Sequence, residues 1–207
     1  MLDNLFEEKL TALIRQLHSE NSLGAGSIEN ALTVDERMQI LIEATPATYE
    51  RHRGEVDGEA ALIADDRRSV ISGSFYKIFK LRDTYQELLN RVGFDLLREI
   101  KLNSIFLLHY PVGSKGTDPH IDNPRYFYKV ISTFILSGHS PFYIHDASNL
   151  EMKVEIAATP GTLVLLRAPI HPNDKITIPP MHSVGKVIED RYSLGFAYRW
   201  FENTILK

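Results

Sequence analysis

The second half of the chain contains a His-x-Asp triplet, His120-Ile121-Asp122. On an extended chain, residues two apart project to the same side, so this imidazole and carboxylate could bind one cation together. Catalytic Fe(II) sites use two histidines and one carboxylate on one face of the metal, which leaves coordination positions open. The triplet alone is a weak signal, because an inert, hydrogen-bonded pair on a surface loop has the same sequence.

Other potential ligands are limited. The triplet His18-Ser19-Glu20 also has the His-x-carboxylate form, but we expect it at a helix end, where residues two apart diverge. The 207 residues include no cysteine, which excludes disulfides, thiolate metal sites, iron–sulfur clusters and a cysteine nucleophile. A metal site in this protein must therefore use histidine and carboxylate.

The second histidine of such a site is predicted to be His182. Nine residues later come Arg191 and Ser193, which share one face of a strand and could offer a guanidinium fork and a hydroxyl to one carboxylate. We expect the metal ligand and this carboxylate clamp to come from neighbouring strands of a hairpin. His171 is the competitor, but it lies twenty residues before Arg191, too far for that hairpin.

The elements that must position these residues differ between the two halves of the chain. Three stretches of the first hundred residues carry apolar residues at helical spacing. They predict helices over residues 2–17, 33–44 and 82–99, the second starting with a Thr33-Val34-Asp35-Glu36 capping box. The polar and charged stretch 51–68 is expected to be a surface loop.

After Leu102 the sequence changes to short β-rich runs separated by glycine and proline. Helices followed by strands predict an α+β fold with a jelly-roll core and N-terminal helices packed on its outside. We expect one domain over 1–207, with a mostly helical part over 1–102 and a jelly-roll catalytic core over 103–207. The predicted strands cover residues 104–109, 129–136, 142–145, 152–156, 162–166 and 191–200.

The order of the polar residues resembles the signature of the Fe(II)/2-oxoglutarate-dependent dioxygenases. This order is His120-x-Asp122, then His182-x-Val184, then Arg191-x-Ser193. The segment Leu108-His109-Tyr110-Pro111 is similar to the strand before the metal ligands, and Pro160-Gly161-Thr162-Leu163-Val164-Leu165 to the strand before the distal histidine. The resemblance covers about residues 104–200. Each motif is loose, but the order and spacing together are fairly specific.

The resemblance implies a double-stranded β-helix fold and iron ligation by His120, Asp122 and His182. Arg191, assisted by Ser193, would bind the distal carboxylate of 2-oxoglutarate. The implied reaction consumes O2, releases succinate and CO2, and hydroxylates a small molecule such as an amino acid or a natural-product intermediate. Because Asp122 is present, the resemblance argues against the halogenase variant, which leaves that ligand position open for chloride.

Two further residues receive expected roles. Tyr110 matches a position whose hydroxyl, in some members of the family, bonds the carboxylate next to the keto group; it could equally be a packed core tyrosine. Arg125 follows Asp122 closely and could anchor an anionic substrate, or it could be a solvated loop residue. Arg191 also has an alternative, as an exposed strand residue paired with Glu189 or Asp190.

Other functions have weaker support. A formal charge of −4 argues against nucleic acid as substrate. Repair demethylases of alkylated bases share an Arg-Tyr-x-Leu strand but carry a further arginine where this chain has Ala197. A non-catalytic, cupin-like or lectin-like β-sandwich is another alternative, although the His-x-His of cupins does not occur here, and hydroxylation of a protein side chain stays open.

The sequence gives a coarse prediction of the cellular location of the protein and of its association with membranes. No apolar run approaches the roughly 18 residues that a membrane span needs, and the acidic N-terminus does not look like a signal peptide. We therefore expect a cytoplasmic protein with no membrane partner. Its oligomeric state, monomer or homodimer, is left open by the sequence.

Overall fold

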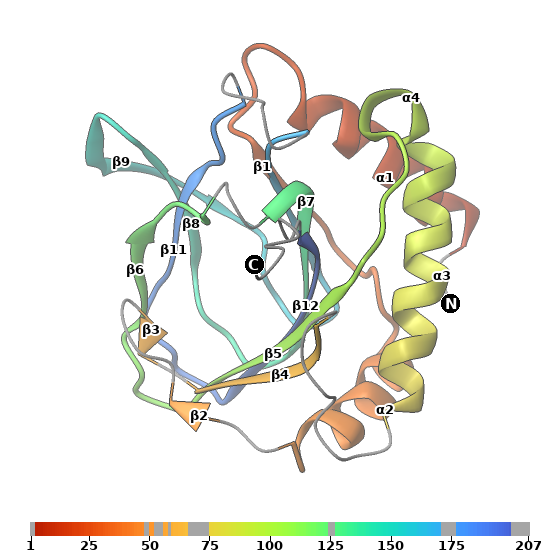
Figure 1. Ribbon diagram of the computed structural model, residues 1–207. Coiled ribbons are helices and arrows are strands. Elements are labelled where there is room, and N and C mark those ends of the chain that lie inside the picture. The colour runs from red at the N-terminus through yellow and green to blue at the C-terminus, as the bar shows by residue number, and fades with distance from the viewer. Residues whose placement is uncertain are drawn as a thin grey trace, which may run out of the picture.

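The computed structural model describes most of the chain, as two antiparallel β-sheets and four helices (Figure 1). The α+β class and the jelly-roll core predicted from the sequence are thereby confirmed. None of the helices in this described part combines the length and hydropathy that crossing a membrane requires. The described residues are 3–47, 50–51, 56–57, 59–65, 75–123, 127–170 and 177–199.

The helices begin where local signals favour them. Helix α1 (Asn4–Leu17) is capped by Asp3, and α2 (Val34–Ala44) starts with the predicted capping box, in which Thr33 and Glu36 bond each other's backbone N–H groups. Helix α3 (Tyr76–Val92) has no side-chain cap of its own. Instead Glu43, near the end of α2, accepts hydrogen bonds from the first N–H groups of α3 at 2.8–3.1 Å. A short helix, α4 (Phe94–Leu97), follows.

Seven strands form the larger sheet and five form the smaller one. The larger sheet has the order β1-β10-β7-β12-β5-β4-β2, and the smaller sheet the order β3-β6-β11-β8-β9. The strands are β1 (Ala25–Ile28), β2 (Glu50–Arg51), β3 (Val56–Asp57), β4 (Glu59–Asp65), β5 (Ser104–Tyr110), β6 (Gly116–His120), β7 (Phe127–Ser137), β8 (Phe142–Asp146), β9 (Asn149–Ile156), β10 (Leu163–Arg167), β11 (Met181–Val184) and β12 (Arg191–Arg199).

Several boundaries differ from the sequence-based expectations. Strand β4 lies within the stretch expected to be a surface loop, and β1 lies in the part expected to be mostly helical. Helix α3 starts six residues before the predicted Arg82 and ends before Gly93, whose backbone N–H caps it. Strand β4 forms by pairing with β5, and β1 forms by pairing with β10; such partners are distant in the sequence and leave no local pattern.

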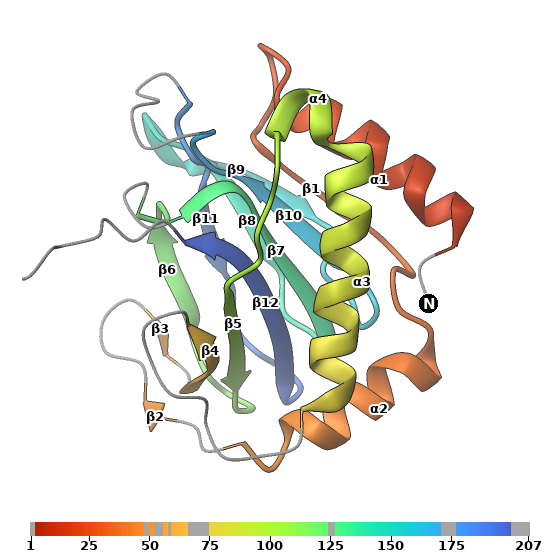
Figure 2. The same cartoon turned by 45° about the vertical axis from the view of Figure 1, so that its right-hand side comes forward.

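Two apolar clusters lie on opposite faces of the larger sheet. The first packs α1, α2 and α3 against that sheet, on the side that the helices cover in Figure 2. The second lies between the two sheets and draws residues from both, such as Ile135 of β7 and Ile144 of β8. The space between the sheets is therefore the inside of the jelly roll, and side chains that project into it can form a site.

Candidate metal centre

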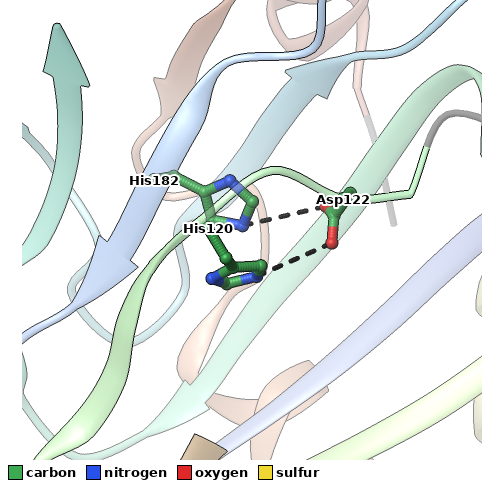
Figure 3. Close-up of side chains that lie close together, drawn as sticks. All are labelled: His120, Asp122 and His182. Carbon is green, nitrogen blue, oxygen red and sulfur yellow. Dashed lines mark ion pairs between the residues drawn. The ribbon is translucent and has the colours of Figure 1, made fainter. Parts of the chain in front are cut away.

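Two adjacent strands of the smaller sheet bring His120, Asp122 and His182 together. His120 ends β6, and His182 lies on β11, which pairs antiparallel with β6 so that these two histidines are direct partners. Asp122 follows His120 by two residues, just beyond the end of the strand. The three side chains point toward one another (Figure 3). Strand pairing thus joins residues that are about sixty positions apart in the sequence.

The ligand atoms of this triad have the spacing of a mononuclear metal site. Nε2 of His120 lies 3.7 Å from one carboxylate oxygen of Asp122, and Nε2 of His182 lies 3.7 Å from the other. All three ligand atoms lie within 4.8 Å of one another. Bonds of about 2.1 Å to a shared cation would place such atoms roughly 3 to 4 Å apart. The residues present therefore fit one divalent metal ion.

The backbone orients both imidazoles for metal binding. Nδ1 of His120 lies 2.9 Å from the carbonyl oxygen of Asp118, and Nδ1 of His182 lies 3.1 Å from that of Pro180. When Nδ1–H donates to the carbonyl, the lone pair of Nε2 is directed toward Asp122 and available to a metal. The same local device serves both histidines, since each bonds the carbonyl two residues before it.

The surroundings of His182 favour its neutral form. Burial is the largest influence and lowers the pKa of His182, while the nearby Asp122 carboxylate acts in the opposite direction. The ring of Phe142 stacks on the imidazole at a centroid distance of 5.6 Å and an interplanar angle of 9°. Because a metal binds the neutral imidazole, a lowered pKa keeps His182 ready to bind at neutral pH.

Arg191 lies across the interior from the triad, on the larger sheet. It begins β12, is 2 % exposed, and ranks among the largest fully buried side chains of the described residues. Within that part of the chain, its Nε and Nη1 have no hydrogen-bond partner. Burial lowers the pKa of Arg191 from its ordinary value, yet a guanidinium stays cationic in a protein. Among the described residues, this buried cation thus has no anion hydrogen-bonded to its Nε or Nη1.

The prediction that the strands of His182 and Arg191 form a hairpin is wrong. Strand β12 pairs with β5 and β7 of the larger sheet, whereas β11 belongs to the smaller one. The alternative in which Asp190 pairs with Arg191 finds no support either, because the Asp190 carboxylate accepts a hydrogen bond from the backbone of Val112. Metal ligand and guanidinium therefore face each other from opposite sheets instead of lying side by side.

Tyr110 and Ser193 lie next to Arg191. Tyr110 is its direct partner on β5, with the guanidinium carbon 5.8 Å from the centroid of the tyrosine ring. The Tyr110 hydroxyl bonds Oγ1 of Thr117 on β6 at 3.0 Å, and burial raises the pKa of Tyr110, which keeps the phenol protonated. Ser193 is buried two residues beyond Arg191, hence on the same face of the strand.

Other residues considered from the sequence lie elsewhere. Arg125 and the competing ligand His171 fall outside the described residues. His109 stacks on Tyr192 at 4.2 Å, on the helix-covered face, and His145 bonds Ser183 on the side of the smaller sheet away from the triad. Neither belongs to the group of potential metal ligands in the described part of the chain.

Two residues of the site were missed from the sequence. Phe142 stacks on His182, and Thr117 accepts or donates the bond to Tyr110 that links the two sheets. Their contacts cross from strand to strand, so no spacing in the sequence could have indicated them. One related signal was present in the sequence, the predicted strand at 142–145. It placed Phe142 in the jelly roll but did not indicate that its ring would contact His182.

Comparison with known proteins identifies the fold. No family model and no curated protein matches the sequence. Among solved structures, a prolyl hydroxylase from Trichoplax adhaerens, in complex with a peptide fragment of the hypoxia inducible factor oxygen degradation domain, is similar with a TM-score of 0.69 and 19% identity over 95% of this chain and 93% of that one. A prolyl-4-hydroxylase from Pseudomonas putida has a TM-score of 0.65 and 14% identity over 93% and 100%.

A third solved structure is an oxidoreductase of the 2OG-Fe(II) oxygenase family from Burkholderia pseudomallei, with a TM-score of 0.65 and 16% identity over 96% of this chain and 92% of that one. The similarity extends over nearly the whole of each chain, so it includes the helices as well as the sheets. The protein therefore has the fold of the 2OG-Fe(II) oxygenases, and the resemblance read from the sequence is confirmed at the level of fold.

Proposed function

We propose that this protein is an Fe(II)- and 2-oxoglutarate-dependent oxygenase that hydroxylates a C–H bond of its substrate and releases succinate and CO2. The observation that carries the proposal is the buried guanidinium of Arg191, two of whose nitrogens lack partners in the described structure. Leaving a charge buried and unpaired costs several kcal/mol, roughly 3 to 5 when a partner is removed. A dicarboxylate cosubstrate would supply the missing anion.

His120, Asp122 and His182 would hold the iron. Their ligand atoms lie within 4.8 Å of one another, and the nitrogen–oxygen donor set suits Fe(II) in a two-histidine, one-carboxylate site. When bound, iron and 2-oxoglutarate supply oxidative decarboxylation by O2 coupled to hydroxylation of a C–H bond. In this proposal the protein orients both imidazoles through backbone carbonyls and keeps His182 neutral by burial.

Arg191, Ser193 and Tyr110 would bind the keto acid. The guanidinium fork matches a carboxylate with two parallel hydrogen bonds, which favours a dicarboxylate over a monocarboxylate such as pyruvate. The Ser193 hydroxyl lies on the same strand face and could donate to the same carboxylate. Tyr110 is held beside Arg191 by its bond to Thr117 and, as a protonated phenol, could donate to a carboxylate oxygen.

The substrate has two candidate classes. We propose a small molecule, such as an amino acid or a natural-product intermediate, as the sequence first suggested. A residue of a polypeptide is the second candidate, favoured by the similarity to two prolyl hydroxylases, one of them solved with a peptide. Incubation with separate panels of free amino acids and of proline-containing peptides, with succinate release measured above the substrate-free rate, distinguishes the two.

The cofactor proposal can be tested without a substrate. Anaerobic addition of Fe(II) and 2-oxoglutarate should produce a weak visible charge-transfer band. The band should disappear in His120→Ala and should require far more 2-oxoglutarate in Arg191→Met. His109→Gln is the matched control, because it replaces a histidine of the opposite strand face and should leave the band unchanged. A band that survives in His120→Ala would contradict the proposal.

A further inference from the structure

Three side chains that project between the sheets are only half buried. On β5, Phe106 and Leu108 lie on the same face as Tyr110, and on β7 Thr133 lies on the same face as Ile135. That face is the interior one, because Ile135 belongs to the cluster between the sheets and Phe106 packs against it. An interior side chain that still meets solvent borders an open space. These three residues therefore border solvent-accessible space on the inner face of the larger sheet, which we call the chamber.

The ring of Phe106 has a fixed place in this chamber because Gly195 has no side chain. Phe106 and Gly195 are direct partners on β5 and β12. A Cβ added to Gly195 would lie 2.0 Å from Cε2 and 2.1 Å from Cζ of the Phe106 ring. The ring therefore occupies the space that a side chain at position 195 would need. Any larger residue at position 195 would push the ring out of that place and into the chamber.

Strand geometry places this ring at the level of the metal ligands. The bond between Tyr110 and Thr117 fixes a common level on β5 and β6, which run in opposite directions (Figure 2). Phe106 lies four residues before Tyr110, about 13 Å along β5, and His120 lies three residues after Thr117, about 10 Å along β6. Both displacements lead toward the same end of the jelly roll. Phe106 thus faces the triad from the opposite sheet.

We propose that Phe106, packed on Gly195, is the wall that sets how closely a substrate approaches the metal, and that the part of the substrate in contact with this wall is apolar. The proposal rests on the proposed function and adds the residue that limits the size of the group beside the metal. The ring offers an apolar surface, and Leu108 extends it. Among the described residues, the charged side chains that we place in the chamber, Arg191 and Asp122, are assigned to the keto acid and the metal.

The test uses probes of the open metal positions and needs no substrate. Co(II) is added to the full-length protein, and its visible d–d bands are followed while imidazole or the bulkier 4-phenylimidazole is titrated. The wild type should bind 4-phenylimidazole at least about tenfold more weakly than imidazole, a discrimination typical of a steric wall. Phe106→Ala should abolish this difference. Gly195→Ala, which displaces the ring into the chamber, should weaken the binding of imidazole itself.

Control variants test whether the Phe106 ring itself causes the discrimination between the two imidazoles. Phe79→Ala removes an equivalent, partly buried ring on the helix side and should leave the discrimination intact. Phe106→Leu, a milder change that preserves folding, should give an intermediate ratio. If Co(II) bands appear but the ratio is the same in wild type, Phe106→Ala and Gly195→Ala, the wall is refuted while the metal centre stands. If His120→Ala retains the Co(II) bands, the metal centre itself, and with it the proposed function, is wrong.

Discussion

The two faces of strand β12 show how one element serves two purposes. Toward the helices it presents Leu194 and Phe196, both fully buried in the larger apolar cluster. Toward the interior of the jelly roll it presents Arg191, Ser193 and Gly195: a charge, a hydroxyl and no side chain at all. Both faces are buried, but only the first of them presents large apolar side chains of β12.

The difference assigns stability and function to opposite sides of one strand. The helix-covered face contributes apolar burial, and aromatic contacts such as the edge-to-face pair of Phe134 and Phe196 at 5.9 Å add to it. The interior face contains a buried guanidinium, which is unfavourable for folding unless a ligand binds it. Substitutions on the two faces should therefore separate thermal stability from ligand binding.

The largest effect is expected on the interior side, at the metal. His120→Ala should weaken Fe(II) binding by more than about a hundredfold, since even loss of a residue supporting a ligand costs 10 to 100-fold. Equilibrium dialysis against Fe(II) or Mn(II) under anaerobic conditions measures this. The melting temperature of the metal-free protein should hardly change. A large loss of metal-free stability would show that His120 is primarily a packing residue.

On the helix side, Phe196→Ala should lower the free energy of unfolding by about 3 to 5 kcal/mol, because it removes a fully buried ring from a packed cluster. Urea denaturation measures this. At a temperature where the variant stays folded, its affinity for 2-oxoglutarate, read from the charge-transfer band, should equal that of the wild type. Equal stability in the two proteins would mean that the cluster repacks around the lost ring.

Arg191→Met exchanges the interior cation for an apolar side chain of similar length. Loss of a bidentate, charge-assisted interaction should weaken 2-oxoglutarate binding by about 2 to 3 kcal/mol, roughly 30 to 150-fold. In the absence of 2-oxoglutarate the variant should be at least as stable as the wild type, because an unpaired buried charge is removed. A titration of the charge-transfer band and a thermal melt without ligand test the two parts. A clearly destabilised variant would show that the guanidinium is already paired in the ligand-free protein.

The smallest effect concerns a single hydroxyl on the helix side. The hydroxyl of Tyr85 on α3 is hydrogen-bonded to that of the buried Ser132 of β7 at 3.0 Å. Tyr85→Phe should therefore lower the free energy of unfolding by about 1 kcal/mol. Burial raises the pKa of Tyr85 above its ordinary value. The unfolded chain therefore loses this proton from about pH 10 upward while the native protein keeps it, and stability falls there. Urea denaturation measures the free energy of unfolding at pH 8 and at pH 11. Its decrease between these two pH values should be smaller in Tyr85→Phe than in the wild type.

Local patterns in the sequence predicted well what depends on neighbouring residues. The apolar spacing around Leu10 and Leu13 predicted α1, and the residues from Thr33 to Glu36 predicted the start of α2 with its capping box. Both signals act within one or two helical turns. Strand boundaries such as Ser104 and Arg191 were also located, because alternation and turn residues are local.

Pairings between distant strands could not be predicted in the same way. The sequence placed Arg191 next to His182 in a hairpin, whereas the two lie in different sheets. Strand β4 was expected to be a loop, because its polar and charged surroundings carry no clear alternation. Register and sheet membership depend on which remote strand offers the complementary edge, and this information is spread over the whole chain.

The sequence by itself determined which groups are available for chemistry: two histidines and an aspartate, an arginine, and no thiol. Only the tertiary structure decided that the arginine faces the triad across the interior, that two of its nitrogens are buried without partners in the described residues, and that a phenylalanine ring lies over Gly195. Residue types and short spacings are properties of the chain, whereas burial and opposition across two sheets arise collectively when the sheets pack.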